Sequence, residues 1–158
     1  MPATIRLLGL GNEILGDDAL GILIARQAEE SFPPEEVEVV SSSESGLHLL
    51  DHVLDVERLI VVDTIQTRGA EPGTVYVVKE EDVPVPAGAD SLHRIGLFET
   101  LALARGLGLR TAEDVTVIAV EAADCLTVGG EMHPAVKAAV PRVMGAIGEL
   151  VAAANPSA

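Results

Sequence analysis

Three carboxylates and one histidine have the types and the placement of a metal site. Asp17 and Asp18 follow a glycine-containing segment, Asp63 ends an apolar run, and His93 lies in a polar stretch. Two carboxylates facing one crevice at ~4 Å repel each other by roughly 4 kcal/mol at an effective dielectric constant of 20, and a cation removes that cost. Oxygen ligands suit Mg²⁺ or Ca²⁺, whereas an added imidazole shifts the preference toward Zn²⁺, Ni²⁺ or another transition metal.

The same four residues also have a purely structural interpretation. One of Asp17 and Asp18 would cap the following helix, and the other would be solvated. Asp63 would form a turn at the end of a strand, and His93 would lie on the surface. The residue types and their placement leave both interpretations open.

The glycine segment and the third aspartate each match a known motif only in part. Gly9–Gly11 opens a dinucleotide-binding fingerprint, but Ile14 stands where its third glycine belongs. We expect these glycines to allow a tight turn at the crevice instead. Asp63-Thr64 is reminiscent of aspartic proteases, but Ile65 replaces their glycine.

The remaining histidine and serine patterns are also incomplete. His48 and His52 have the i, i+4 spacing of a metal-binding pair, but Leu49 stands where the protease motif has glutamate. We therefore expect core or surface histidines there, and a structural role for His133 before a helix. Ser41–Ser43 has no nucleophile-elbow pattern, so a serine triad has no support.

Alternating strands and helices must position these groups. Apolar runs predict five strands, at Thr4–Leu10, Val37–Ser41, Arg58–Asp63, Gly73–Lys79 and Val115–Val120. Helical spacing predicts helices at Ala19–Glu30, Gly46–Val53, Ile95–Gly106 and Ala135–Ala154. Loops are expected at Glu80–Leu92 and at Ala122–Pro134. His93 is expected at the end of the first of these, the long loop after the fourth strand. The fold class is α/β, a three-layer α/β/α arrangement in one domain of residues 1–158.

The strand connections bring the acids together. Only QTRGAEPG separates the third and fourth strands, too short for a crossover helix, so the fourth strand should be antiparallel in a mostly parallel sheet. If the second and third strands flank the first, the first and third lie at a topological switch point, where open α/β sheets bind ligands. Asp17, Asp18 and Asp63 would meet there.

Composition excludes several classes of protein. The formal charge of −15 argues against nucleic-acid binding, since phosphate contacts need clustered Lys and Arg. Cys125 is the one cysteine and cannot form an internal disulfide, which fits a reducing compartment and a small buried side chain. The first residues do not form a signal peptide, and no stretch approaches the ~18 apolar residues of a membrane helix. We expect a soluble, cytoplasmic protein.

The chain resembles the nickel–iron hydrogenase maturation endopeptidases along nearly its whole length. The specific block is GLGNEILGDDALG (Gly9–Gly21), followed by VVDTIQTRGAEPGTVYVV (Val61–Val78) and SLHRIGLFETLALARGLG (Ser91–Gly108). A weaker block is VTVIAVEAADCLTVGGEMHPAVKAAVP (Val115–Pro141). The resemblance implies a five-stranded sheet between helices with an antiparallel fourth strand, which agrees with the interpretation above.

The resemblance also implies the site and the reaction. Asp18, Asp63 and His93 would be the metal ligands and the catalytic residues, and Asp17 would cap the helix or support the site. The enzyme would remove the C-terminal extension of a hydrogenase large-subunit precursor. Nickel, supplied by the precursor, would be the recognition element. The protease would be a monomer without nucleic-acid or membrane partners.

Several alternatives stay open at this stage. The water could be activated by the metal or by a carboxylate acting as general base. A conventional metallopeptidase with a resident metal and another protein substrate would use the same residues. So would a nickel-binding chaperone that inspects the precursor without cutting it, and a nucleotide-binding module is a more remote alternative.

Two segments depart from the family pattern. Ser41–Glu44 replaces an Asp-Gly-Gly-Thr-like turn after the second strand, in a loop that borders the crevice in relatives. Ala122 and Ala123 stand where relatives tend to carry proline after the glutamate. The first departure leaves the metal residues in place and bears on substrate preference.

Overall fold

Five strands pair in the order β2-β1-β3-β5-β4, so β1 lies between β2 and β3. The strands are β1 (Ile5–Leu10), β2 (Val37–Ser42), β3 (Arg58–Ile65), β4 (Val75–Lys79) and β5 (Asp114–Glu121). All neighbouring pairs are parallel except β4 with β5. This computed structural model describes residues 5–82 and 92–155, without the side chains of residues 92–95. The predicted sheet, including its antiparallel fourth strand and its switch point at β1, is confirmed.

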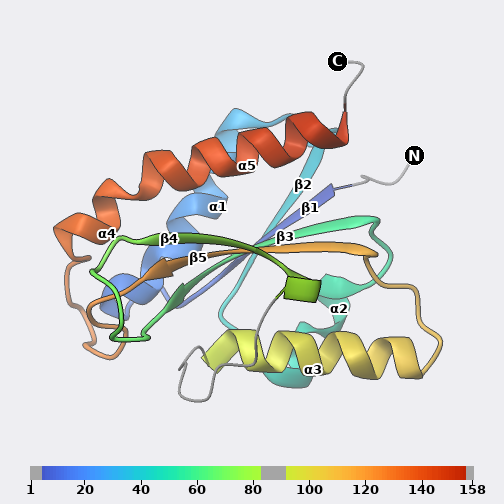
Figure 1. Cartoon of the computed structure of the whole chain (residues 1–158), viewed down its shortest axis with the longest axis horizontal. Coiled ribbons are helices and arrows are strands. Elements are labelled where there is room, and N and C mark those ends of the chain that lie inside the picture. Colours follow the sequence, from blue (N-terminus) through green and yellow to red (C-terminus); the bar gives the residue numbers. More distant parts are fainter. Residues whose placement is uncertain (1–4, 83–91, 156–158) are drawn as a thin grey trace.

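Helices cover both faces of the sheet (Figure 1). One face carries α1 (Leu20–Ser31) and α5 (Val140–Ala154), and the other carries α2 (Leu50–Val53) and α3 (Leu92–Gly106). Shorter turns complete the connections: η1 (Gly16–Ala19), η2 (Gly46–Leu49), η3 (Glu80–Asp82) and α4 (Pro134–Ala138). Within the described ranges, no helix combines the length and the apolar content that crossing a membrane requires.

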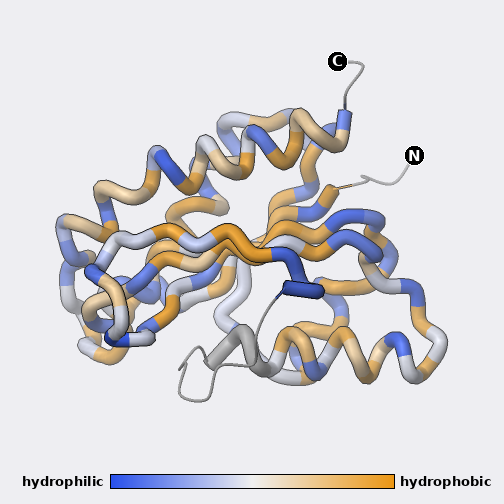
Figure 2. Tube along the Cα trace, viewed as in Figure 1, coloured by the Kyte–Doolittle hydropathy of each residue, from blue (hydrophilic) through white to orange (hydrophobic). Residues whose placement is uncertain are grey.

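The alternation of side chains along the strands divides the core into two layers. In β1, Ile5 and Leu7 pack in the layer of α1 and α5, whereas Leu8 and Leu10 pack in the layer of α2 and α3. The central strands β1, β3 and β5 are buried almost throughout, as expected for parallel strands covered on both faces. Figure 2 shows hydrophobic residues gathered along the central strands, whereas hydrophobic and hydrophilic residues alternate along the helices.

The backbones of α1 and β1 lie in direct contact at two glycines. A Cβ on Gly9 would lie 2.2 Å from the Gly21 carbonyl oxygen, and a Cβ on Gly21 would lie 2.0 Å from the Leu10 carbonyl oxygen. Only glycine permits so close an approach. The glycines therefore hold the start of α1, and with it η1, against the carboxyl end of β1.

The closing helix and the third strand differ from their predicted bounds. The closing helix is split at Ala139 into α4 and α5, because Pro141 stands in the first turn of α5 and is compatible only with a helix start. β3 continues two residues past Asp63 to Ile65, because its pairing with β5 extends to the Ile65–Glu121 pair. Asp63 is therefore inside a strand, not at its end.

Candidate active site

The loops after β1, β3 and β5 meet at the carboxyl end of the parallel strands. β1 pairs with β3 only as far as the Gly9–Val62 pair, so Asp63 is the first β3 residue beyond it. The chain leaving β1 enters η1, which carries Asp17 and Asp18. The predicted convergence of these two segments is present.

Asp18 is held by the tight turn of η1. Its backbone N–H donates to the Leu15 carbonyl at 2.8 Å, and its carbonyl accepts from the Asn12 N–H at 3.0 Å. Gly16 enters the turn at φ +48°, and a Cβ there would lie 2.8 Å from the Asp124 carbonyl oxygen. Glycine is required both for that conformation and for that contact. The Asp18 side chain is 8% exposed.

Thr64 connects Asp18 to Asp63. Its hydroxyl donates to Asp18 Oδ1 at 3.1 Å, and its backbone N–H donates to Asp63 Oδ1 at 2.8 Å. Asp63 is 1% exposed and Thr64 is 4% exposed. Two carboxylates 45 residues apart in sequence therefore share one hydrogen-bonding residue in a site largely shielded from solvent. Their mutual repulsion is what a cation would relieve.

Asp17 neither caps a helix nor is solvated, so the structural interpretation of the acid pair is wrong. Neither η1 nor α1 has a side-chain cap, and Asp17 is 1% exposed. Its Oδ2 accepts from the N–H groups of Ala123 at 2.7 Å and Asp124 at 2.9 Å. Its Oδ1 accepts from the N–H of His133 at 2.7 Å. These three hydrogen bonds hold the loop after β5 against η1.

His93 was expected in a loop but lies in the first turn of α3. The helix begins at Leu92, because no proline separates His93 from the predicted helix start at Ile95. The His93 side chain lies outside the part of the chain whose side chains the structure describes. Among the described residues, no group of three His, Cys, Asp or Glu side chains has metal-binding spacing.

Cys125 adds a thiol beside the acid pair. Its Sγ lies 3.5 Å from the Thr64 hydroxyl oxygen. Burial is the main cause that raises the pKa of the Cys125 thiol to about 11, and the negative charges of Asp18, Asp17 and Asp63 contribute to the rise. At neutral pH the thiol is protonated and is a poor nucleophile.

Glu121 is a buried carboxylate at the end of β5 that no sequence motif identified. It is 1% exposed, and its Oε2 accepts from the Thr67 N–H at 2.8 Å. Its Oε1 accepts from the Thr67 and Tyr76 hydroxyls. Burial and the Glu121 charge raise the pKa of Tyr76. An acid ending the apolar run VTVIAV was the available signal, since Asp63 was selected on the same ground.

The other histidines have structural surroundings. His52 Nε2 lies 3.3 Å from Glu44 Oε2, and His48 is exposed on η2. His133 Nδ1 accepts from the Ala135 N–H at 3.1 Å and caps α4. None of these contacts involves Asp18 or Asp63.

The two departures from the family pattern lie at the same end of the sheet. Ser41–Ser43 lines a groove of about 340 Å³ together with Gly11–Ile14, Ile22 and Arg26. The Ser42 hydroxyl accepts from the Glu44 N–H at 3.0 Å. Ala122 donates its N–H to the Ile65 carbonyl at 2.8 Å, a bond that proline cannot make.

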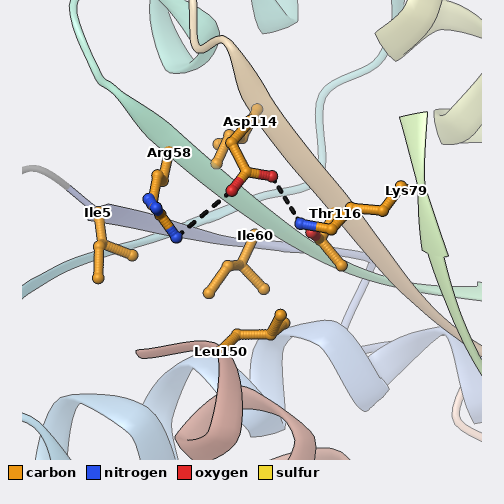
Figure 3. A pocket seen from close by; sticks show the side chains of 8 residues that line it. Ile5, Arg58, Ile60, Lys79, Asp114, Thr116 and Leu150 are labelled. Carbon is orange, nitrogen blue, oxygen red and sulfur yellow. Dashed lines mark hydrogen bonds and ion pairs between the residues drawn. The ribbon is translucent and has the colours of Figure 1, made fainter. Parts of the chain in front are cut away.

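A small pocket at the opposite end of the sheet has no comparable chemistry (Figure 3). There Asp114 accepts from Lys79 at 2.7 Å and pairs with Arg58 at 3.4 Å, so its charge is balanced. The volume of this pocket, about 10 Å³, is near the minimum for one water molecule. The acid pair at the carboxyl end of the parallel strands is the better candidate for an active site.

Curated proteins of similar sequence carry names that refer to hydrogenase expression, formation or maturation. The hydrogenase expression/formation protein HupD of Rhodobacter capsulatus is 32% identical over 138 residues, which cover 85% of this chain and 65% of that protein. The hydrogenase 2 maturation protease of Escherichia coli is 32% identical over 106 residues, covering 66% of this chain and 65% of that protein. The chain thus spans just under two thirds of the length of these two relatives.

Solved structures and a family model agree with those relatives. The hydrogenase maturating endopeptidase HybD from E. coli superposes with a TM-score of 0.82 at 26% identity, covering 96% of this chain and 93% of that one. A family model described as hydrogenase maturation protease matches residues 22–150, a range that includes Asp63 and His93. This match, over more than half of the chain, shows that the chain belongs to the hydrogenase maturation protease family.

Proposed function

We propose that this chain is an endopeptidase that removes the C-terminal extension of a hydrogenase large-subunit precursor already loaded with nickel. The observation that carries the proposal is the pair of buried carboxylates, Asp18 and Asp63, joined through Thr64 at the carboxyl end of the sheet. Family membership supports the reaction class.

The donor set favours a metal that arrives with the substrate. Two carboxylates and the imidazole of His93, with no thiolate, form a sparse cage compared with the closed four-ligand sites that hold structural zinc. Such a set is suited to completing the coordination of nickel that the precursor already holds. Recognition would then depend on nickel and polypeptide together.

The carboxylates and Thr64 would have distinct tasks in this reaction. Thr64 fixes one oxygen of Asp18 and one of Asp63, so both carboxylates are oriented before the precursor binds. Anchoring nickel to them places the neighbouring peptide bond at a fixed position, which supplies the proximity part of catalysis. The attacking water is activated by the metal or by one of the carboxylates.

Cleavage of matched precursors tests the proposal. The purified protein is mixed with nickel-loaded or nickel-free precursor, and the products are weighed by mass spectrometry. We expect only the loaded precursor to lose its extension. Asp18→Asn and Asp63→Asn should each reduce cleavage by at least about 100-fold, because replacing a group that only supports a metal ligand already costs about 10–100-fold.

Histidine variants provide matched controls for the third ligand. His93→Ala should abolish cleavage, whereas His48→Ala and His52→Ala should retain most of it. Loss of activity in both control variants, with circular dichroism unchanged, would move the site to the η2–α2 segment.

The alternatives give different results. Stoichiometric zinc in the resting protein, together with equal cleavage of both precursors, would indicate a conventional metallopeptidase. Binding of the loaded precursor without any cleavage would indicate a chaperone.

A further inference from the structure

Three large apolar side chains are exposed beside the crevice. The exposed fractions are 56% for Ile14, 75% for Leu126 and 71% for Val128. Single exposed apolar residues are ordinary on protein surfaces, whereas a group of them indicates a contact surface. We call these three residues the apolar rim.

Backbone contacts hold the two segments of the apolar rim together. Leu15 and Val128 form an antiparallel bridge, and the Gly129 N–H donates to the Ile14 carbonyl at 2.7 Å. The loop after β1 and the loop after β5 therefore lie side by side, so the exposed residues Ile14 and Val128 are carried by adjoining backbone, with Leu126 two residues away.

Hydrogen bonds within the protein order the loop that carries Leu126 and Val128. Asp124 Oδ1 accepts from the N–H groups of Leu126 at 2.8 Å and Thr127 at 3.1 Å. Asp17 accepts from the N–H groups of Ala123 and Asp124, as described above. Four backbone N–H groups of this loop are thus bonded within the protein, while the Leu126 and Val128 side chains remain exposed. A preordered surface loses little conformational entropy on binding.

The rim adjoins both the acid pair and the groove. Cys125, next to Leu126, contacts Thr64, which bonds both carboxylates. Ile14 also lines the groove of about 340 Å³ at Ser41–Ser43, a volume in the range of ligand sites. A polypeptide that reaches Asp18 and Asp63 can therefore continue over the rim and into the groove.

We propose that the apolar rim docks an extended, apolar segment of the precursor polypeptide beside its cleaved bond, independently of nickel. This inference rests on the proposed function. Carboxylates bind the cation but contribute nothing to an apolar side chain, so the rim supplies the polypeptide part of recognition. A second copy of this chain is a poor occupant, because two chains with a formal charge of −15 each repel one another, and the second copy would cover the acids.

Steady-state cleavage of nickel-loaded precursor tests the rim. The variant Leu126→Gln/Val128→Thr should raise KM by about tenfold, equivalent to 1.4 kcal/mol, with kcat within twofold of wild type. Leu107→Gln is the matched control, because Leu107 is 65% exposed but lies just after α3, at the other end of the molecule. It should leave both constants unchanged. Unchanged circular dichroism and Tm establish that each variant is folded.

Binding of nickel-free precursor, measured by biolayer interferometry, separates the two proposals. Weaker binding by the rim variant than by Leu107→Gln supports the inference. Absence of cleavage by the wild-type protein would overturn the proposed function, but it would not affect this binding result. Equal KM and equal binding for the rim and control variants would overturn the inference while leaving cleavage intact. A wild-type dimer that the rim variant converts to monomer would also overturn it, because the rim would then be a self-interface.

Discussion

Asp17 and Asp18 are neighbours in sequence with different tasks in the structure. Asp18 bonds the Thr64 hydroxyl, whereas Asp17 accepts three backbone N–H groups from the loop after β5. Buried donors that lose their acceptor incur a desolvation penalty, so Asp17 is a determinant of stability.

Asp17→Ala should therefore lower the free energy of unfolding by about 1–3 kcal/mol, since three partly buried N–H groups lose a carboxylate acceptor. Glu29→Ala, at an exposed position of α1, should change it by less than about 0.5 kcal/mol. Urea denaturation measures both values. Equal stability of the two variants would contradict the anchoring role.

Cys125 should be unreactive in the folded protein. A pKa near 11 instead of 9.0 leaves about a hundredfold fewer thiolates at pH 8, so alkylation by iodoacetamide should be slower by at least that factor. The rate should climb as the pH rises toward 11. Protein unfolded in urea is the control and should titrate near 9.0; a folded midpoint at that same value would contradict the shift.

Sequence located the acids but not their surroundings. Strand placement pointed to Asp17, Asp18 and Asp63, and the family resemblance chose Asp18 over Asp17. Thr64 gained its role only from the geometry, because its hydroxyl reaches a residue 46 positions away in the chain. The structural role of Asp17 also depends on a long-range contact that no local spacing reveals. Motif reasoning identifies the acids themselves more readily than the groups that orient them.

At the scale of elements, strand and helix order followed from the apolar patterns, and boundaries were less accurate. The short link between β3 and β4 was sufficient to predict an antiparallel strand. The start of α3 and the break before α5 were missed, because apolar spacing continues across both. Pro141 was the available signal for the second of these.

The contact between α1 and β1 gives a sharp test at this scale. Gly21→Ala places a Cβ 2.0 Å from the Leu10 carbonyl oxygen, so α1 must move away from β1. We expect a loss of stability of about 2–4 kcal/mol or failure to fold, comparable with other strained core substitutions. Gly145→Ala in α5 is the control, because its Cβ meets nothing within 4 Å and should stabilise by about 0.5–1 kcal/mol. Thermal unfolding that is equal for both variants would contradict the close packing.

At the scale of the molecule, charge repulsion opposes folding. There are 25 acidic against 10 basic residues, and exposed pairs such as Arg26–Glu13 contribute only about 0–1 kcal/mol each. Repulsion should therefore outweigh the ion pairs, and salt should stabilise the protein by screening it.

Raising NaCl from 0.02 to 0.5 M at pH 7 should increase Tm by about 2–5 °C, since screening relieves net repulsion. Near the isoelectric point of about 4.4 the increase should vanish, because the net charge is then close to zero. Calorimetric scans at both pH values measure the effect. A fall in Tm with salt at pH 7 would show that ion pairs dominate.

The three bonds of Asp17 also constrain the order in which the protein folds. They join positions 106, 107 and 116 residues apart, so the chain must close long loops before any of them forms. Contacts of such separation slow folding and form after local structure. A growing polypeptide cannot complete the crevice until His133 has left the ribosome. The carboxyl end of the sheet is therefore completed late, from segments that lie far apart in the chain.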